Sequence, residues 1–314
     1  MTHSLKIGLA LGSGAARGWT HIGVINALQK AGIKPDVVVG TSIGALVGAA
    51  YLSNKLPDLQ QRLLNLTKLE TARFFNIGFP FNGVVNKDKL HQFLRQYVAD
   101  EATLIEDLPA RYASVATHLH SGQEVWNTEG KLLEAVWSSI SLPGLFPAIK
   151  HHGRWLIDGG LVNPVPVSVC RALGADIVIA VNLNGDILGK HLHQNPPVPK
   201  NDQSSNLLGN RIGEFITNYT GNLFGEEKTP KEDVPDMFAA IAASVNITQD
   251  RITRSRMAGD PPDVLLQPRL SHIGLLEFYR AAEAIQAGKQ SVEKNLAEIK
   301  FCLGSVDLSK PPLL

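Results

Sequence analysis

Hydrophobic residues along this chain fall into short apolar runs and longer stretches with helical spacing. The runs at 6–11, 37–39 and 177–181 are bounded by glycine or polar residues, which is typical of buried strands. In 19–32, apolar residues recur every three or four positions, which indicates a helix that ends at Gly32. Because parallel strands need crossover connections, this order of elements predicts an α/β fold with a parallel sheet.

Later segments extend the same pattern. Residues 87–98 have the spacing of an amphipathic helix, with Leu90 and Leu94 turned inward. The segments 112–119 and 124–127 predict paired strands around a Ser-Gly turn. Helices are also expected from 56 onward and at 131–139, 165–173, 237–257 and 275–296, and strands at 155–158 and 264–266.

Two segments depart from this regular pattern. Four phenylalanines at 74–81 predict an aromatic loop, either a small core cluster or the wall of an acyl-chain site. The stretch 186–235 is rich in proline, asparagine and glutamine, which favours a loop or poorly ordered insert. Within it, 208–223 keeps helical spacing and predicts a packed helix, a lid, a dimer face or a membrane contact. We expect a single domain over 1–314, with its core at about 5–183 and 236–300.

Composition narrows the classes of function. The 314 residues carry 30 Lys and Arg against 29 Asp and Glu, a net charge of +1, which does not favour a nucleic-acid partner. Cys170 and Cys302 lack metal or redox spacing, so buried free thiols in a reducing compartment are expected. The sequence has neither a signal-peptide pattern nor an apolar run of about 20 residues. These features predict a cytoplasmic location and leave peripheral membrane contact and the oligomeric state open.

The segment Gly40-Thr41-Ser42-Ile43-Gly44 is the first candidate for chemistry. A G-x-S-x-G between a strand and a helix has the form of a nucleophile elbow, in which Gly40 and Gly44 allow a sharp turn. Such a turn presents the Ser42 hydroxyl at the positive end of the following helix. The alternative is an ordinary strand-to-helix turn in which Ser42 caps the helix.

The loop 12–18 follows the first predicted strand and has three candidate roles. A dinucleotide fingerprint would need glycine where Arg17 stands, and Asp36 precedes the second strand instead of ending it. A phosphate-binding P-loop would need a Gly-Lys-Ser/Thr sequence. The third role is an oxyanion hole, because small residues let backbone N–H groups approach a substrate. A glycine turn that only packs strand against helix is the remaining alternative.

Asp158-Gly159-Gly160 ends a short apolar strand and supplies a candidate base. In open α/β sheets the carboxyl ends of strands line the ligand crevice, so Asp158 is expected near Ser42, although an Asp-Gly-Gly is also an ordinary turn. Ser42, Asp158 and His272 follow the chain order of α/β-hydrolase triads. Those folds place the elbow after several strands, however, and here it follows the second. The alternative is a two-residue site in which Asp158 takes the serine proton directly. The paired histidines 118/120, 151/152 and 191/193 lack a third ligand at metal spacing.

Three ordered motifs together resemble the patatin-like phospholipase family. They are Gly12-x-Gly14-x-x-Arg17-Gly18, Gly40-Thr41-Ser42-Ile43-Gly44 and Asp158-Gly159-Gly160. The segments 142–147 and 161–166 are similar to those of its bacterial members, the RssA-type proteins related to neuropathy target esterase. The resemblance covers 5–183 strongly and 263–288 more loosely.

The resemblance implies a three-layer α/β/α fold with a mostly parallel central sheet. It also implies a carboxylic ester hydrolase that cleaves acyl esters of lipids without a cofactor or a metal. Ser42 would be the nucleophile and Asp158 the base of a catalytic dyad. The oxyanion hole would come from Gly12, Ser13, Gly14, Ala15, Arg17 and Gly18, with Gly40, Gly44, Gly159 and Gly160 as supporting motif residues.

One departure from the family concerns the oxyanion loop, which often contains consecutive glycines. Here Ser13, Ala15 and Ala16 interrupt the run, and their small size is expected to keep the backbone approachable. Arg17 matches the basic position of the family and would steady the loop or attract a phosphate headgroup. Apolar neighbours of Asp158 are expected to raise its pKa toward that of a useful base. The alternatives are a regulatory or scaffold protein with this fold, the His272 triad and, least favoured, a dinucleotide-binding protein.

Overall fold

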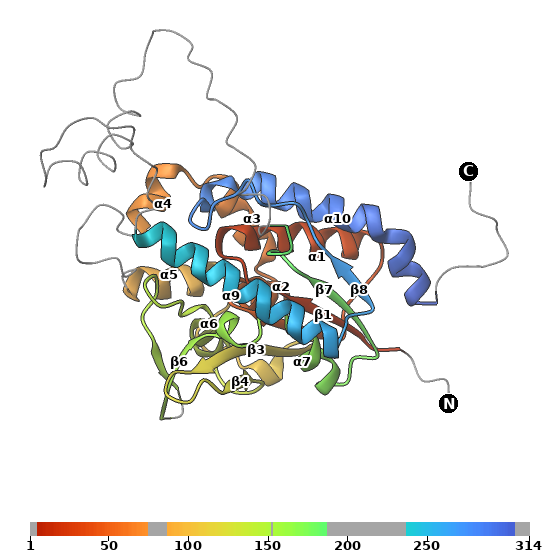
Figure 1. Ribbon diagram of the computed structural model, residues 1–314, viewed down its shortest axis with the longest axis horizontal. Helices are drawn as coiled ribbons and strands as arrows, with labels where there is room; N and C mark the ends of the chain where they lie inside the picture. The colour runs from red at the N-terminus through yellow and green to blue at the C-terminus, as the bar shows by residue number, and fades with distance from the viewer. Residues whose placement is uncertain (1–4, 75–86, 152, 187–236, 305–314) are drawn as a thin grey trace, which may run out of the picture.

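The computed structural model describes residues 5–74, 87–151, 153–186 and 237–304 (Figure 1). The predicted aromatic loop beyond Phe74, the insert 186–235 beyond Asp186, and His152, His191 and His193 lie outside these residues. The described chain is built on one eight-stranded sheet with the order β5-β6-β3-β2-β1-β7-β8, in which β4 also pairs with β3. The strands are β1 Ile7–Leu11, β2 Val37–Thr41, β3 Arg111–His118, β4 Glu124–Asn127, β5 Ile149–His151, β6 Arg154–Asp158, β7 Ile177–Val181 and β8 Val264–Leu266.

The centre of the sheet is parallel and its β4–β6 region is not. Strands β3, β2, β1, β7 and β8 pair in parallel, as the crossover pattern predicts. Strands β4 and β6 pair antiparallel with β3, and β5 pairs antiparallel with β6. The sequence pattern did not predict β5, because Ile149 is the single apolar residue among its three and no apolar run marks the strand.

Helices cover both faces of the sheet, which confirms the predicted three-layer α/β/α architecture. Figure 1 shows α1 and α10 side by side on one face, and they pack along their lengths. Helix α7 lies on the other face, together with the end of α9. The helices are α1 Thr20–Lys30, α2 Ile43–Leu52, α3 Leu56–Leu64, α4 Lys68–Phe74, α5 Lys87–Tyr97, α6 Leu132–Ile140, α7 Val167–Ala172, α9 Met237–Gly259 and α10 Ala281–Cys302, with short 3₁₀ turns η1 Ala15–Trp19, η2 Ile105–Asp107, η3 Gly159–Leu161 and η4 Phe278–Arg280.

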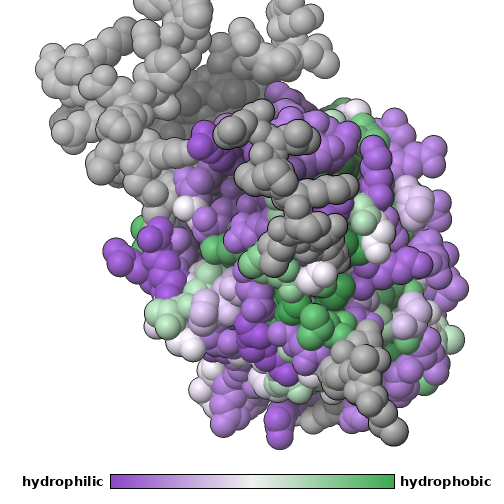
Figure 2. All heavy atoms as spheres, turned by 90° about the vertical axis from the view of Figure 1, so that its right-hand side faces the viewer, coloured by the Kyte–Doolittle hydropathy of each residue, from purple (hydrophilic) through white to green (hydrophobic). Residues whose placement is uncertain are grey.

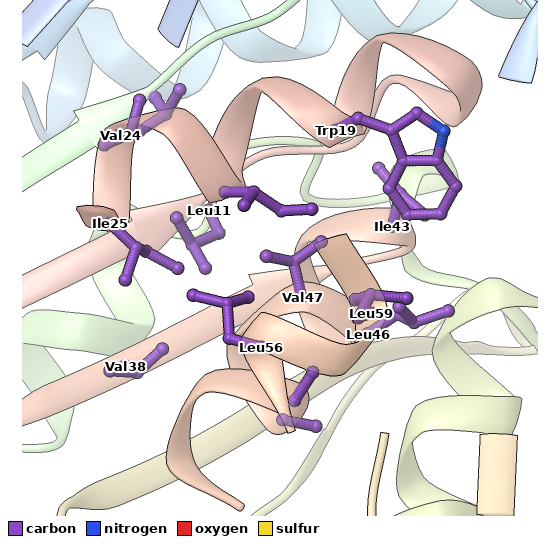
Figure 3. Close-up of a cluster of buried hydrophobic side chains, with 14 of the residues drawn as sticks. Leu11, Trp19, Val24, Ile25, Val38, Ile43, Leu46, Val47, Leu56 and Leu59 are labelled. Atoms are coloured by element: carbon purple, nitrogen blue, oxygen red, sulfur yellow. The ribbon is translucent and has the colours of Figure 1, made fainter. Parts of the chain in front are cut away.

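Alternate residues of the central strands enter two separate cores. In β1, Leu9 and Leu11 face the larger core, whereas Ala10 faces the smaller one on the α7 side. Figure 3 shows the larger core, where Leu11 and Val38 of the sheet meet side chains from α1, α2 and α3. Strands buried on both faces read as continuous apolar runs, and this explains the absence of polar alternation in these segments.

Several element ends differ from the sequence expectation. Helix α10 begins at Ala281 instead of 275, because a turn in which Gly274 N–H donates to Glu277 and the 3₁₀ turn η4 occupy the residues before it. Cys170 is a buried free thiol as predicted, whereas the free thiol of Cys302 is partly exposed.

The face in Figure 2 is largely hydrophilic, with a group of hydrophobic residues near its centre. Among the helices of the described residues, none has the length and hydrophobicity needed to cross a membrane.

Candidate active site

Ser42 stands at a sharp turn between β2 and α2. Its backbone has φ 57° and ψ −125°, a conformation that costs a non-glycine residue about 1–3 kcal/mol and that concentrates at functional sites. The flanking glycines are required by space: a Cβ on Gly40 would lie 2.3 Å from the Ala45 nitrogen, and one on Gly44 would lie 2.1 Å from the Leu11 oxygen. Ser42 occupies the N-cap position of α2, but its hydroxyl does not cap the helix.

The Ser42 hydroxyl instead donates a short hydrogen bond to Asp158. Its Oγ lies 2.5 Å from Asp158 Oδ2. The other carboxylate oxygen, Oδ1, accepts the Gly160 N–H at 2.7 Å, and the Thr117 hydroxyl donates to the Asp158 backbone oxygen at 2.8 Å. The structure therefore brings together Ser42 of the predicted elbow and Asp158 of the Asp-Gly-Gly turn.

The reason for their proximity differs from the one expected. Asp158 does not share the edge formed by the carboxyl ends of parallel strands, because β6 is antiparallel. Strand β4 pairs along one edge of β3. Strands β2 and β6 both pair along the opposite edge of β3, and they run toward each other there because β2 is parallel to β3 and β6 is antiparallel. Thr41 pairs with Val115 and Asp158 with the next residue, Ala116, so the two strands end against each other.

Burial sets the acidity of Asp158. The side chain is almost inaccessible to solvent, and this desolvation raises its pKa from 3.8 to about 6, against the opposing effect of the Ser42 and Gly160 hydrogen bonds. The apolar sequence neighbours of Asp158 predict this upward shift of its pKa. A carboxylate with a pKa near 6 is mostly ionised at pH 7 and is a stronger base than an exposed aspartate.

Ser139 supports the elbow and was not found from the sequence. Its Oγ accepts the Ser42 N–H at 2.9 Å and its hydroxyl donates to the Val115 oxygen at 2.6 Å. The side chain is buried on α6, so one hydroxyl fixes both the strained turn and the adjoining strand. No motif surrounds Ser139, and only the three-dimensional packing of α6 against the sheet identifies it.

The loop of small residues at 12–18, called the small-residue loop below, contains two backbone N–H groups without a partner among the described residues. The Gly12 N–H donates to Val181 and the Ser13 N–H to Pro164, so these two groups are occupied within the fold. Those of Gly14 and Ala15 make no hydrogen bond to any described residue. Ala15 lines an apolar cavity together with Ser42 and has φ 48°, a conformation that favours glycine.

Arg17 is buried beneath this loop. Its Nε donates to the Gly14 oxygen at 3.3 Å, and its Nη2 donates to Asn246 Oδ1 of α9 at 2.8 Å. Burial lowers its pKa to about 10, and the negative charge of Asp186 acts in the opposite direction. With 2% of its surface exposed, Arg17 steadies the loop and has no free face for a headgroup. Because the Gly14 oxygen and the Ala15 N–H belong to one planar peptide, fixing the oxygen also fixes the N–H.

An apolar cavity of about 120 Å³ opens beside Ser42. Its walls come from helices that are distant in sequence, and its residues include Leu46, Leu63, Leu66, Leu90, Phe93 and Leu142. Phe74, from the start of the predicted aromatic loop, also lines it. This lining resembles sites for apolar ligands, which hold few polar groups.

Among the described residues, no histidine ring hydrogen-bonds to Ser42 or Asp158. His272 is half-exposed, lies 3.5 Å from Glu283, and its backbone oxygen accepts from Arg280. His21 is buried, bonds the Gly12 oxygen at 2.7 Å, and its pKa falls to about 4 because of burial, so its ring is neutral. The geometry does not support the Ser42–Asp158–His272 triad. Within the same residues, His, Cys, Asp and Glu side chains do not gather in threes that could hold a metal ion.

The chain belongs to the patatin-like phospholipase family. The sequence model of this family matches residues 9–171, about half of the chain, including Ser42 and Asp158. This match confirms the family that the three ordered motifs predict. Patatin-like phospholipases are carboxylic ester hydrolases that act on lipids, and the protein is an enzyme of this class.

Named relatives extend the similarity beyond the family match. An uncharacterized NTE family protein of Mycobacterium bovis is 29% identical, covering 91% of this chain and 90% of that protein. Lysophospholipase NTE1 of Yarrowia lipolytica is 29% identical over 94% of this chain, but the match is 20% of its own length. Neuropathy target esterase sws of Drosophila melanogaster is 35% identical over 57% of this chain and 13% of its own. The crystal structure of VipD from Legionella pneumophila aligns with a TM-score of 0.36 at 12% identity, covering 96% of this chain and 77% of that one.

Proposed function

We propose that this protein hydrolyses acyl esters of lipids with a Ser42–Asp158 dyad and an oxyanion hole made by the Gly14 and Ala15 N–H groups. The observation that carries the proposal is the 2.5 Å hydrogen bond from the Ser42 hydroxyl to a buried carboxylate beside an apolar cavity. Nucleophile and base within hydrogen-bonding reach are the signature of covalent acyl transfer.

The reaction follows from this geometry in two halves. Ser42 Oγ attacks the ester carbonyl as its proton passes to Asp158 Oδ2, and the negative oxygen of the tetrahedral intermediate accepts from Gly14 and Ala15 N–H. The intermediate collapses to an acyl-Ser42 ester as Asp158 returns the proton to the leaving alcohol. Water then gives its proton to Asp158 and attacks the acyl-enzyme. The collapse of this second intermediate releases the fatty acid and restores the Ser42 hydroxyl.

The two carboxylate oxygens of Asp158 have different roles in the proposed reaction. Oδ1 is held by the Gly160 N–H and fixes the orientation of the carboxylate, while Oδ2 faces Ser42 and moves the proton. A histidine usually performs this role in serine hydrolases because its pKa is near neutral. Burial brings the pKa of Asp158 to about 6, so the carboxylate serves as a base of comparable strength.

The apolar cavity supports a substrate with one acyl chain seated beside Ser42. Burying each methylene of that chain contributes about 0.8 kcal/mol of binding free energy. Lysophospholipids carry a single chain, and relatives named lysophospholipase match nearly the whole of this chain. We therefore include lysophospholipids as the preferred substrate class. A cytoplasmic location with peripheral membrane contact belongs to the same proposal, supported by the two free cysteines and by the lipid substrate.

Hydrolysis of a panel of esters tests the proposal. The panel contains a lysophospholipid, a diacyl phospholipid and a chromogenic butyrate ester, each assayed with wild type, Ser42→Ala and Asp158→Asn. Ser255→Ala on the exposed side of α9 is the matched control. Both site variants are expected to lose at least about a thousandfold in kcat/KM, and the control none. Equal rates for wild type and Ser42→Ala would contradict the enzyme mechanism and favour a scaffold that binds partners.

A further inference from the structure

Helix α9 turns amide side chains toward the small-residue loop. Asn246 and Gln249 are three residues apart and so lie on one face of the helix. Asn246 Oδ1 accepts from Arg17 Nη2 at 2.8 Å, and Gln249 Oε1 accepts from the Ser13 hydroxyl at 3.0 Å. Since a helix that only covered a sheet would present apolar residues here, this polar contact calls for a separate explanation.

Gln249 touches both halves of the proposed catalytic site. Its Oε1 accepts from Ser13 and also from Asn184 Nδ2, each at 3.0 Å. Its Nε2 rests against Gly160: a Cβ on that glycine would lie 2.5 Å from Nε2 and 2.9 Å from Asp158 Oδ1. The Gln249 Nε2 and the Asp158 Oδ1 therefore both lie close to the position that a Cβ on Gly160 would occupy.

Electrostatics selects this orientation of the Gln249 amide. The reverse orientation would turn its carbonyl oxygen toward the Asp158 carboxylate, where two negative poles repel each other. The observed one gives Oε1 two donors and places the amide N–H₂ group on the side of Gly160 and the Asp158 turn. Gln249 is 5% exposed and Ser13 1% exposed, so water does not replace these contacts. Leaving a buried amide oxygen unpaired is costly, and the Gln249 Oε1 avoids this cost with its two donors.

We propose that Gln249 is a positioning residue that fixes the small-residue loop and the Asp158-Gly159-Gly160 turn relative to each other. Through Ser13 it anchors the peptide that precedes Gly14 and Ala15, and through Nε2 it supports the ionised carboxylate and the Gly160 N–H bonded to it. The inference rests on the proposed function, because it assigns Gln249 a role in the same reaction. Gln249 contacts neither Ser42 nor the substrate cavity and acts through the other residues.

The charged groups around Gln249 define what a change there would perturb. Arg17 of η1 bonds the nearby Asn246 and interacts with Asp186, and Asp250 and its partner Arg254 lie on α9 itself. Arg256, two turns further along α9, pairs with Glu124 of β4. Asp158 is the carboxylate that meets the Nε2 side of the amide. Replacing Nε2 with an oxygen therefore acts first on Asp158.

The substitution Gln249→Glu tests this role with little change of shape. A glutamate still accepts from Ser13 and Asn184, but it places an oxygen instead of an N–H₂ group beside Asp158. The midpoint of the acid limb in the pH profile of kcat/KM is expected to shift to higher pH by about one unit. A nearby acceptor or negative charge disfavours ionisation of Asp158 and so raises its pKa. The matched control is Thr248→Glu, which adds the same charge at the neighbouring exposed position and should leave the limb unmoved.

A second variant, Gln249→Met, removes the hydrogen bonds and keeps the approximate volume. The expected result is a fall of about tenfold in kcat with KM unchanged, and a limb shifted in the same direction. A residue that only packed α9 would lower the melting temperature and leave the pH limb and the ratio of kcat to KM in place. Those results, or the failure of both variants to fold, would overturn the inference. Loss of hydrolysis in Ser42→Ala is measured in parallel, so that failure of the proposed function is seen separately.

Discussion

Asp158→Asn is expected to stabilise the folded protein while it removes activity. The Asp158 carboxylate is buried, and its burial raises the pKa from 3.8 to about 6. A pKa raised in the folded state means that ionisation opposes folding. Asparagine has almost the same shape and carries no charge, so the variant escapes this cost. Active-site residues that reduce stability in return for function are a general feature of enzymes.

The size and sign of the effect follow from the two pKa values. Well below pH 3.8, Asp158 is protonated in both states and the cost is absent. As pH rises, the unfolded chain ionises first, and the folded state becomes less stable until pH passes 6. The cost is about 0.5 kcal/mol at pH 4 and about 3 kcal/mol at pH 7. The stability difference between Asp158→Asn and wild type should therefore increase by about 2 kcal/mol over this range.

Equilibrium unfolding in urea at pH 4 and at pH 7 measures this difference. Comparing the two proteins at each pH cancels the titration of all other groups. Asp58→Asn, an exposed aspartate in the first turn of α3, serves as control and should differ from wild type by no more than about 0.5 kcal/mol at either pH. A difference between Asp158→Asn and wild type that is equal at both pH values, or smaller at pH 7, would refute a buried carboxylate with a raised pKa.

Three further expectations follow from the same site. The kcat/KM for ester hydrolysis should rise about tenfold from pH 5 to pH 7 with its midpoint near 6, because only ionised Asp158 accepts the proton; a midpoint near 4 in a pH–rate series would contradict this. Leu66→Trp, at a partly buried position of the cavity, should lower hydrolysis of long-chain esters at least about fivefold and spare butyrate esters, as measured by chain-length profiles. Ser139→Ala should lower the free energy of unfolding by about 1–3 kcal/mol and reduce kcat, because it leaves the Ser42 N–H without its partner. Unchanged urea midpoints and rates would count against that role for Ser139.

Local patterns in the sequence predicted much of the fold and the centre of the site. The elbow at Ser42 and the turn after Asp158 are recognisable because glycine is needed where backbones approach closely, and such constraints leave a signal within a few residues. The central strands are equally visible, because burial on both faces makes them continuously apolar. The antiparallel course of β6 is not visible in this way, since its apolar run reads the same in either direction.

The residues that sequence reasoning missed act over long separations in the chain. Ser139 is 97 residues from the turn that it supports, and Gln249 is 236 residues from Ser13. A buried serine or glutamine on a helix has no local signature, because its role depends on which loop packs against it. The same limit applies to the loop donors: backbone hydrogen bonds occupy Gly12 and Ser13, and only the fold distinguishes them from Gly14 and Ala15.

We propose that Ser42 and Asp158 act together without a histidine. The most direct measurement is mass spectrometric mapping of the adduct formed with a fluorophosphonate, which reacts covalently with activated serines, together with its rate of formation. We expect an adduct on Ser42 that forms at the wild-type rate in His272→Ala and at least about a hundredfold more slowly in Asp158→Asn. An adduct on another residue, or a collapse of the rate in His272→Ala, would contradict it.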